Sequence, residues 1–318
     1  MRDAPIQRIS ENLFLIDLDL PLPGFCSFIS TWVIKVDDRA IVIDPGPSAT
    51  VSTVCNALSE LGVKGVDYVL LTHIHLDHAG GCGGLIAHYP DPMVVCHPQA
   101  LDHLADPERL WHGSLKVLKD LARAYGEPLP IKREKLCPGC DIQWKGYKIA
   151  CLETPGHASH HLSFFLEDIV FAGEVAGVRI PSGNPPYMRP ATPPPFQPEV
   201  ALRSIDNVIK HRPERICYGH YGIMDNAVRM LESAQEQIKL WLEIIRGRRV
   251  KGLGMDEGEI LEEMLAKDPG LRFFHQLKPD VQERETYFLK NSIRGMVGDA
   301  RLERATSGSG DQRSIHLS

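Results

Sequence analysis

The segment Tyr68-Val69-Leu70-Leu71-Thr72-His73-Ile74-His75-Leu76-Asp77-His78-Ala79-Gly80-Gly81 decides the fold that we predict for this chain. It begins with apolar residues and ends in two glycines, and between them lie four side chains that can bind a metal ion: His73, His75, Asp77 and His78. This order predicts a buried strand that ends at Thr72, a loop that carries the ligands, and a helix that begins near Ala79. Side chains alternate along extended backbone, so the first two histidines point to the same side. Imidazole and carboxylate groups suit zinc, iron or manganese, and we interpret the segment as a metal site rather than a polar surface loop.

Three later segments repeat the same order of an apolar strand, a small residue and a potential ligand. They end at His157, Glu174 and His220. Ligands at strand ends gather along one edge of a sheet, which can hold them rigidly. Asp44 also follows a strand, and we expect it to orient a ligand histidine or Asp77. His160 and His161 come just after the first of these ligands, and we expect them to lie behind the ligands or at the surface.

Length, charge and composition limit the class of protein. The 318 residues suffice for one large domain, or one large and one small, and the apolar fraction of 43% allows a full core. A net charge of -6 argues against binding nucleic acid through bulk charge. No apolar segment has the length of a membrane span, and the N-terminus lacks the pattern of a signal peptide. We therefore expect a cytoplasmic protein with a small-molecule partner and no membrane or nucleic-acid partner; a homodimer is left open.

The eight cysteines do not have the spacing of a disulfide scaffold. Cys137-Pro-Gly-Cys140 is a CxxC motif, which is found in zinc sites and redox pairs. No second CxxC is present to complete a zinc site, and the Pro-Gly centre is typical of a β-turn. We interpret the motif as a turn that precedes a strand.

Apolar periodicity predicts a β-rich main region with interspersed helices. The predicted strands are 9–20, 31–36, 40–43, 66–71, 93–96, 142–144, 147–153, 162–166, 169–172 and 215–218. The predicted helices are 51–61, 80–88, 98–126 and 199–211. The proline-rich segment 181–198 is predicted to be an irregular loop rather than a linker, because strands and helices resume after it. It leaves the strand that carries Glu174, so we expect it to form a wall of the site.

From Asp225 onward the pattern changes to long helices. One apolar stripe runs through residues 227–245, a capping box at Asp256 and Glu259 precedes a second helix, and residues 281–296 predict a third. Their apolar faces need a partner surface. We predict a catalytic domain of residues 1–224, a small helical region of residues 225–303 packed on it, and a flexible tail of residues 304–318.

With these motifs in place, the sequence resembles the metallo-β-lactamase superfamily over roughly residues 10–222. The resemblance rests on segments in the expected order: 43–46, 72–81, 154–157, 173–174 and 219–220. The His-x-His-x-Asp-His element is the most specific of them. The resemblance implies an α+β fold, a four-layer αββα sandwich, here with a small C-terminal helical region.

The resemblance also implies how the ligands divide between two metal ions. The first ion would be held by His73, His75 and His157, and the second by Asp77, His78 and His220. The family usually has a bridging aspartate where this chain has Glu174. The extra methylene lengthens the side chain, so Glu174 is expected either to bridge both ions from a retracted backbone or to bind one ion only.

Two divalent ions, with zinc expected first and iron or manganese as alternatives, would activate a bound water and polarise a carbonyl oxygen. The expected reaction is hydrolysis of a small ester, lactone or thioester by metal-bound hydroxide, with Asp77 accepting a proton. Tyr187 or Tyr221 would donate a hydrogen bond to the oxyanion. The expected substrate contacts come from the proline-rich loop: Tyr187, Met188 and Arg189, the last for an anionic group.

Three other functions are kept as alternatives. Some members of the superfamily are phosphodiesterases or RNA-processing nucleases, which the acidic charge disfavours. A single-iron oxygenase acting on a thiol is favoured if Glu174 does not bridge. A non-catalytic ligand-binding protein on the same fold is disfavoured by the intact histidine set.

Overall fold

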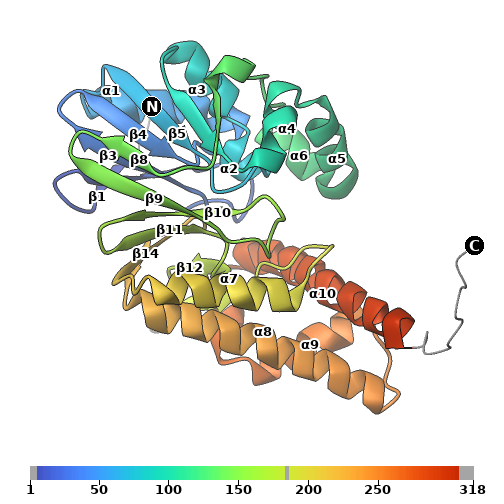
Figure 1. Cartoon of the computed structure of the whole chain (residues 1–318). Helices are drawn as coiled ribbons and strands as arrows, with labels where there is room; N and C mark the ends of the chain where they lie inside the picture. Colours follow the sequence, from blue (N-terminus) through green and yellow to red (C-terminus); the bar gives the residue numbers. More distant parts are fainter. Residues whose placement is uncertain (1–5, 183–185, 308–318) are drawn as a thin grey trace, which may run out of the picture.

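The computed structural model describes residues 6–182 and 186–307, which form four stacked layers (Figure 1). Two β-sheets pack face to face, and helices cover the outer face of each sheet. The predicted αββα sandwich of the α+β class is therefore confirmed.

The first sheet has seven strands in chain order, antiparallel from β1 to β4 and parallel from β4 to β7. Of residues 9–20, which were predicted as one opening strand, only Leu13–Asp17 form a strand, and another strand, Ile6–Arg8, precedes the predicted range. The chain reverses before Leu13, whose carbonyl accepts from the amides of Ile9 and Ser10. The strands are β1 (Ile6–Arg8), β2 (Leu13–Asp17), β3 (Ser30–Val36), β4 (Arg39–Ile43), β5 (Gly65–Leu70), β6 (Met93–Cys96) and β7 (Leu136–Pro138).

The second sheet has six strands, and only the β11–β14 pair is parallel. In order across the sheet they are β15 (Ile223–Asp225), β14 (Arg215–Tyr218), β11 (Ile169–Gly173), β10 (Leu162–Leu166), β9 (Tyr147–Glu153) and β8 (Ile142–Trp144). A separate hairpin pairs β12 (Val178–Ile180) with β13 (Tyr187–Arg189). The segment 181–198 is thus not wholly irregular, because β13 lies within it.

Helices α1 to α6 lie with the first sheet, and α7 to α10 lie with the second (Figure 1). The helix predicted for residues 80–88 begins two residues later, at Cys82, and a separate short helix, Leu76–Ala79, precedes Gly80 and Gly81. The helices are α1 (Val51–Glu60), α2 (Leu76–Ala79), α3 (Cys82–His88), α4 (Leu101–Ala105), α5 (Glu108–Leu118), α6 (Asp120–Tyr125), α7 (Pro198–Lys210), α8 (Ala227–Val250), α9 (Glu257–Lys267) and α10 (Pro279–Ser307). Residues 304–307, expected in the tail, belong to α10, and 308–318 lie outside the described residues.

The core follows from the two-residue period of the strands. In β2, Leu13 and Leu15 face the second sheet and join the apolar layer between the sheets. The alternate residues Phe14 and Ile16 join the layer under the helices of the first sheet. Strands that are apolar on both faces must be covered on both, and here the second sheet covers one face and helices cover the other.

Backbone hydrogen bonds tie the two sheets together at one edge. The Ser30 amide donates to the Gly219 carbonyl at 2.9 Å, and the Leu162 amide donates to the Thr72 carbonyl at 2.7 Å. The indole of Trp32 donates to the Tyr218 carbonyl at 3.0 Å. Each of these bonds joins a segment of the first sheet to a segment of the second, next to a ligand-bearing turn or strand end. The expected ligands therefore meet at a rigid junction of the sheets.

The CxxC motif lies where the chain passes from β7 to β8, that is, from one sheet to the other. Cys137 and Cys140 are both free thiols, with their sulfur atoms 3.7 Å apart. The motif therefore stands at a connection between strands, in agreement with the turn interpretation.

The helices after Asp225 share one apolar core with the second sheet. Trp241 of α8 is fully buried, and its indole donates to Asp268 at 2.6 Å. The α10 residues Leu289 and Ile293 are also fully buried in this core, together with Ile216 of β14. Residues of the second sheet would be exposed to water without these helices.

Ending the chain at Asp225 is therefore expected to abolish cooperative folding. Removal of α8 to α10 exposes apolar core residues, each worth about 1.5–3 kcal/mol when buried. Thermal melting and size-exclusion chromatography measure the effect, and a chain that ends at Ser307 serves as the control. Cooperative melting of residues 226–307 on their own would contradict this view of a shared core.

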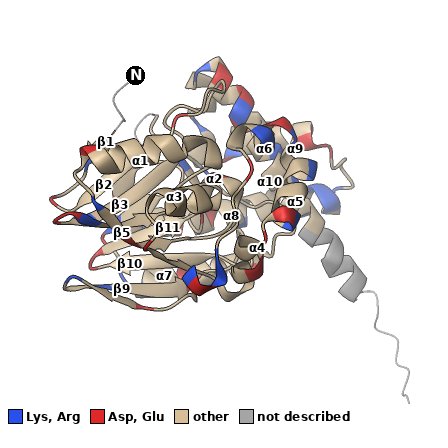
Figure 2. Cartoon of the chain, turned by 90° about the horizontal axis from the view of Figure 1, so that it is seen from above, with Lys and Arg blue, Asp and Glu red and all other residues tan. Residues whose placement is uncertain are grey.

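Among the described residues, no helix combines the length and the apolar character needed to cross a membrane. Figure 2 shows lysine and arginine interspersed with aspartate and glutamate along the outer helices. This mixture agrees with the absence of a bulk positive charge in the sequence.

Candidate metal centre

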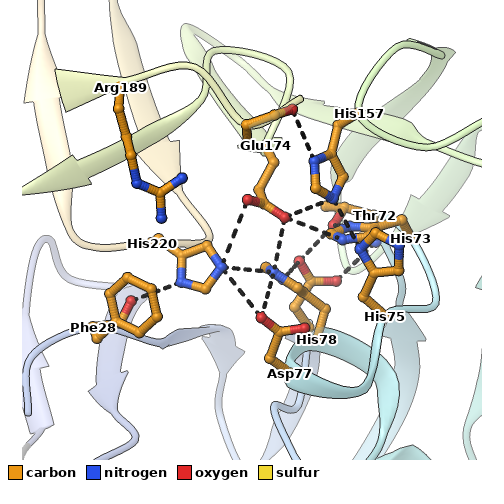
Figure 3. Close-up of polar contacts among 12 residues, drawn as sticks. Phe28, Thr72, His73, His75, Asp77, His78, His157, Glu174, Arg189 and His220 are labelled. Atoms are coloured by element: carbon orange, nitrogen blue, oxygen red, sulfur yellow. Dashed lines mark hydrogen bonds and ion pairs between the residues drawn. The ribbon is translucent and has the colours of Figure 1, made fainter. Parts of the chain in front are cut away.

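The structure brings all seven predicted ligands together at the edge where the sheets meet (Figure 3). They form two adjoining groups, and within each group one donor atom per residue lies within 4.8 Å of the others. One group contains His73, His75, His157 and Glu174, and the other contains Asp77, His78 and His220. This division matches the two ligand sets that the family resemblance implied, with Glu174 added to the first.

Four of the five ligand histidines use Nδ1 for a hydrogen bond and present Nε2 to the cluster. Nδ1 of His73 bonds to the Thr72 hydroxyl at 3.1 Å. Nδ1 of His157 bonds to the Ala191 carbonyl at 3.1 Å. Nδ1 of His220 donates to the Phe28 carbonyl at 3.0 Å. Partners of this kind fix the ring orientation and the tautomer of a ligand histidine.

Asp44 is the shared anchor of this arrangement. Its carboxylate accepts from the Thr72 amide at 2.8 Å, from the Thr72 hydroxyl at 2.6 Å, and from Nδ1 of His78 at 3.1 Å. The same Thr72 hydroxyl then accepts from His73, so one buried carboxylate orients a ligand of each group. The orienting role predicted for Asp44 agrees with this geometry.

Glu174 occupies the centre of the cluster. Its Oε2 lies 2.8 Å from Nε2 of His157, 3.4 Å from Nε2 of His73 and 3.6 Å from Nε2 of His78. Its Oε1 lies 3.8 Å from Nε2 of His220. The carboxylate thus reaches ligands of both groups, which is the position expected of a bridging ligand.

A bulge in β11 explains how the longer glutamate fits. Pairing with β14 shifts register between Phe171 and Gly173, which moves the strand end. Gly173 has φ of +51°, and a Cβ there would lie 2.6 Å from His161 and 2.7 Å from the Thr72 hydroxyl. Only glycine allows this close approach, so the backbone before Glu174 is set by the absence of a side chain.

His161 lies behind the ligands, which is one of the two positions expected for it from the sequence. It is fully buried, its Nε2 accepts from the Glu174 amide at 3.1 Å, and its Nδ1 bonds to the Thr154 hydroxyl at 2.8 Å. The position next to His160 carried no signal for this function. His161 therefore supports the backbone of Glu174 and does not compete as a ligand.

The donor set fits a metal ion on its own chemistry. Nε2 of His73 is buried and makes no hydrogen bond, although such groups are normally satisfied. Burial lowers the pKa of His73 well below its ordinary value, and burial with the neighbouring His157 lowers that of His75 to about 3. Both imidazoles are therefore neutral near pH 7, which is the form that binds metals.

The second group contains an ionised carboxylate, Asp77, and a protonated histidine, His78. Burial acts to raise the pKa of Asp77, but the charges of His78 and His220 outweigh it and lower the pKa to about 2. Burial acts to lower the pKa of His78, but Asp77 and Asp44 raise it to about 9. A metal ion bound by this group would release the proton of His78.

The cluster opens into a cavity of about 580 Å³. His75, Asp77, His157, Glu174 and His220 line it, so both ligand groups are accessible from the same space. Its other walls come from α5, from α10 and from the proline-rich segment through Pro193, Pro194 and Pro195. The expectation that the proline-rich segment borders the site agrees with this lining.

Two of the residues predicted to contact substrate are placed elsewhere. Tyr187 is fully buried in the core that includes α8 to α10, and the Met188 carbonyl accepts from Gln237 of α8 at 2.9 Å. Neither is among the described residues that line the cavity. The prediction failed because β13 turns these side chains toward the C-terminal helices.

Tyr221 also points away from the cavity. Its hydroxyl donates to Asp17 at 3.0 Å, and it is absent from the described residues that form the cavity wall. Burial raises the pKa of Tyr221 to about 12, so the hydroxyl stays protonated. The predicted hydrogen bond from Tyr187 or Tyr221 to an oxyanion is therefore not supported.

Arg189 does line the cavity, and its guanidinium points toward the ligand cluster (Figure 3). Its Nε donates to Glu285 of α10 at 2.5 Å, and its guanidinium carbon lies 5.1 Å from the centre of the Phe288 ring. Glu285 is fully buried and also binds Arg284, with nitrogen and oxygen 3.0 Å apart. The buried cluster of Arg189, Arg284 and Glu285 thus contains two cations and one anion.

Comparisons with known proteins agree with this geometry. The family profile described as the metallo-beta-lactamase superfamily matches residues 24–220. The metallo-beta-lactamase fold-containing protein ST1585 of Sulfurisphaera tokodaii is 25% identical over 224 residues, covering 67% of this chain and 82% of that protein. The hydroxyacylglutathione hydrolase of Aeromonas hydrophila is 27% identical over 161 residues, covering 49% of this chain and 52% of that enzyme. The chain thus spans about half the length of that hydrolase.

Solved structures show the same fold. ST1585 from Sulfolobus tokodaii superposes with a TM-score of 0.62 at 23% identity, covering 83% of this chain and 99% of that chain. The metallo-beta-lactamase family protein TTHA1429 from Thermus thermophilus gives a TM-score of 0.61 at 20% identity, covering 94% of this chain and 96% of that chain. With the fold, the ligand cluster and the profile match in agreement, this chain belongs to the metallo-beta-lactamase superfamily of metal-dependent hydrolases.

Proposed function

We propose that this protein hydrolyses a small ester, lactone or thioester that carries an anionic group. The observation that carries the proposal is the cluster of seven ligands on the wall of a cavity of about 580 Å³. A cavity of this size suits a small molecule. Hydroxyacylglutathione hydrolases, which act on a thioester, are among the relatives, and this supports testing thioesters first.

We assign two divalent ions to the cluster, zinc first, with iron or manganese as alternatives. When bound, such ions supply an activated water and polarise the carbonyl oxygen. The chain itself holds the ligand rings in place through Asp44, Thr72 and backbone carbonyls. Asp77, whose Oδ2 lies 3.4 Å from Nε2 of His220, is the carboxylate that we assign to accept the proton of the attacking water.

Glu174 decides between this proposal and a single-iron oxygenase. The oxygenase is favoured if Glu174 does not bridge, but its carboxylate lies between ligands of both groups. We therefore keep hydrolysis as the proposed reaction.

The test is metal analysis of the purified protein followed by a substrate panel. The protein is loaded with zinc, iron or manganese and assayed with a thioester, a lactone, a carboxylic ester and a phosphodiester. Turnover of a carboxylic ester, lactone or thioester that is lost on chelation supports the proposal. Turnover of the phosphodiester alone, or oxygen consumption with a thiol, would replace it.

Arg189 is expected to bind the anionic group of the substrate. Its Nε is held by Glu285, which leaves the terminal amino groups on the cavity side (Figure 3). Arg189→Met should raise KM for an anionic substrate roughly 10- to 100-fold, because a hydrogen bond to a charged group is worth about 1.5–3 kcal/mol. Arg189→Lys should recover part of the loss.

Steady-state kinetics with a matched anionic and neutral ester measure this effect. Arg179→Met is the control, because Arg179 of β12 donates to the Tyr221 carbonyl and is absent from the described cavity wall. If Arg189→Met weakens the neutral and anionic esters equally, Arg189 supports the fold and does not bind the substrate.

A further inference from the structure

Helix α5 presents an unusual face to the cavity. None of its residues is fully buried, although it is amphipathic. The α5 residues that line the cavity recur at one-turn spacing along one side of the helix, and this side is apolar apart from its first residue and Ser114: Arg109, Leu110, Gly113, Ser114, Val117 and Leu118. An apolar helix face normally packs against protein. Part of this face instead borders open space that is continuous with the metal ligands.

Helix α10 forms part of the wall of the same cavity. Phe288, Asn291 and Ser292 line it, and they too recur at one-turn spacing. The Tyr287 hydroxyl lies 3.5 Å from the Val117 carbonyl, so the two helices meet at one place. Val117 is 64% exposed and Tyr287 is 40% exposed, which gives the contact an apolar rim. Phe28 and Tyr125 add aromatic surface to the cavity wall.

Gly113 lines the cavity and has open space where a side chain would be. A Cβ built at Gly113 would meet no atom within 4 Å, and its backbone has no positive φ that demands glycine. The close packing that explains Gly173 is thus absent here, and local structure does not require the missing side chain. A glycine on the cavity face of α5 leaves room that a ligand can fill.

From these observations we propose that the space bordered by α5 and α10 binds an unbranched apolar acyl chain of the substrate, with Gly113 setting the chain length that fits. This inference rests on the proposed function for its substrate class, since the acyl carbonyl would lie at the ligand cluster. The apolar walls favour such a chain, because burying apolar surface is worth about 25 cal/mol per Å². The expected substrate therefore combines an apolar acyl chain with an anionic group near Arg189.

Binding of simple fatty acids tests this inference without requiring turnover. Dissociation constants of butanoate, hexanoate, octanoate and decanoate are measured by calorimetry on the metal-loaded protein. Affinity should rise with each methylene by up to about fourfold, the equivalent of about 0.8 kcal/mol. Gly113→Leu should weaken octanoate and decanoate roughly tenfold, because overpacking costs about 1–3 kcal/mol, and should leave butanoate nearly unchanged. The affinities of Gly113→Ala for octanoate and decanoate should fall between those of the unmodified protein and those of Gly113→Leu.

Gly247→Leu is the matched control. Gly247 lies in α8, a Cβ there also meets no atom within 4 Å, and it does not belong to the described cavity wall. Its substitution should leave all four affinities unchanged. Circular dichroism and thermal melting of each variant confirm that the fold is retained.

The outcomes separate the two proposals. Affinity that does not depend on chain length, or a Gly113→Leu effect equal for butanoate and decanoate, overturns the acyl-chain site. Chain-length selection that Gly113→Leu removes supports the site, even if no ester or thioester is hydrolysed. In that last case the proposed reaction fails while the binding site stands.

Discussion

The double variant His73→Ala and His75→Ala is expected to lose the metal ion of the first ligand group. The two imidazoles come from the loop after β5, and with His157 they supply three of the four donors of that group. Alanine offers no donor, and the remaining histidine and carboxylate cannot hold an ion with the affinity that a complete site gives. The fold should be kept, because the Thr72 backbone that anchors the loop to Asp44 is unchanged.

Elemental analysis of the purified variant measures this effect, with far-UV circular dichroism as the check on folding. The matched control is His88→Ala with His112→Ala, two histidines on helices outside the described ligand groups. The control should keep the metal stoichiometry of the unmodified protein. An unchanged stoichiometry in the His73 and His75 variant would disprove the assignment of the first group.

Glu174→Gln is expected to reduce hydrolysis by orders of magnitude. Glutamine keeps the size of the side chain but removes a charge that faces ligands of both groups. The metal of the second group should be lost first, because that group then keeps only Asp77, His78 and His220, whereas the amide oxygen at position 174 still faces His73 and His157 of the first group. Glu174→Asp should be milder, since it keeps the charge and the family resemblance places aspartate at this position.

Metal stoichiometry and kcat of the two variants are measured side by side. Glu153→Gln is the control, because that carboxylate also stands at a strand end of the same sheet, that of β9, but is 68% exposed. It should change neither quantity. Two full metal ions in an anomalous-scattering map with Glu174 turned away would refute the bridging role. A single ion held by His73, His75 and His157 would instead favour the mononuclear alternative.

The sequence, read together with the family resemblance, predicted the seven residues that the structure gathers into two groups. His73, His75, Asp77, His78, His157, Glu174 and His220 all follow an apolar strand and a turn, and the structure gathers them at one edge. This works because the strand period and the turn residues are local properties of the chain. Parallel strands then place their ends together, as β4 and β5 do for Asp44 and the His73 loop.

Tertiary structure alone decided which side chains border the cavity. Arg189 depends on Glu285, 96 positions later, and Tyr187 is removed from the site by packing against the same C-terminal region. The local pattern of residues 187–189 does not distinguish these outcomes. Alternation along β13 shows which side chains share a face, but only the packed helices decide which face borders the cavity.

The central position of Glu174 in the cluster could likewise not be predicted from local sequence. It depends on the bulge before Gly173 and on His161, which accepts from the Glu174 amide. The open face of α5 was also hidden, because an apolar stripe predicts burial without saying whether protein or a ligand covers it. Short-range periodicity therefore indicated the strands, the helices and the candidate ligands, and the family resemblance implied the layers, whereas long-range packing determined the shape and charge of the cavity.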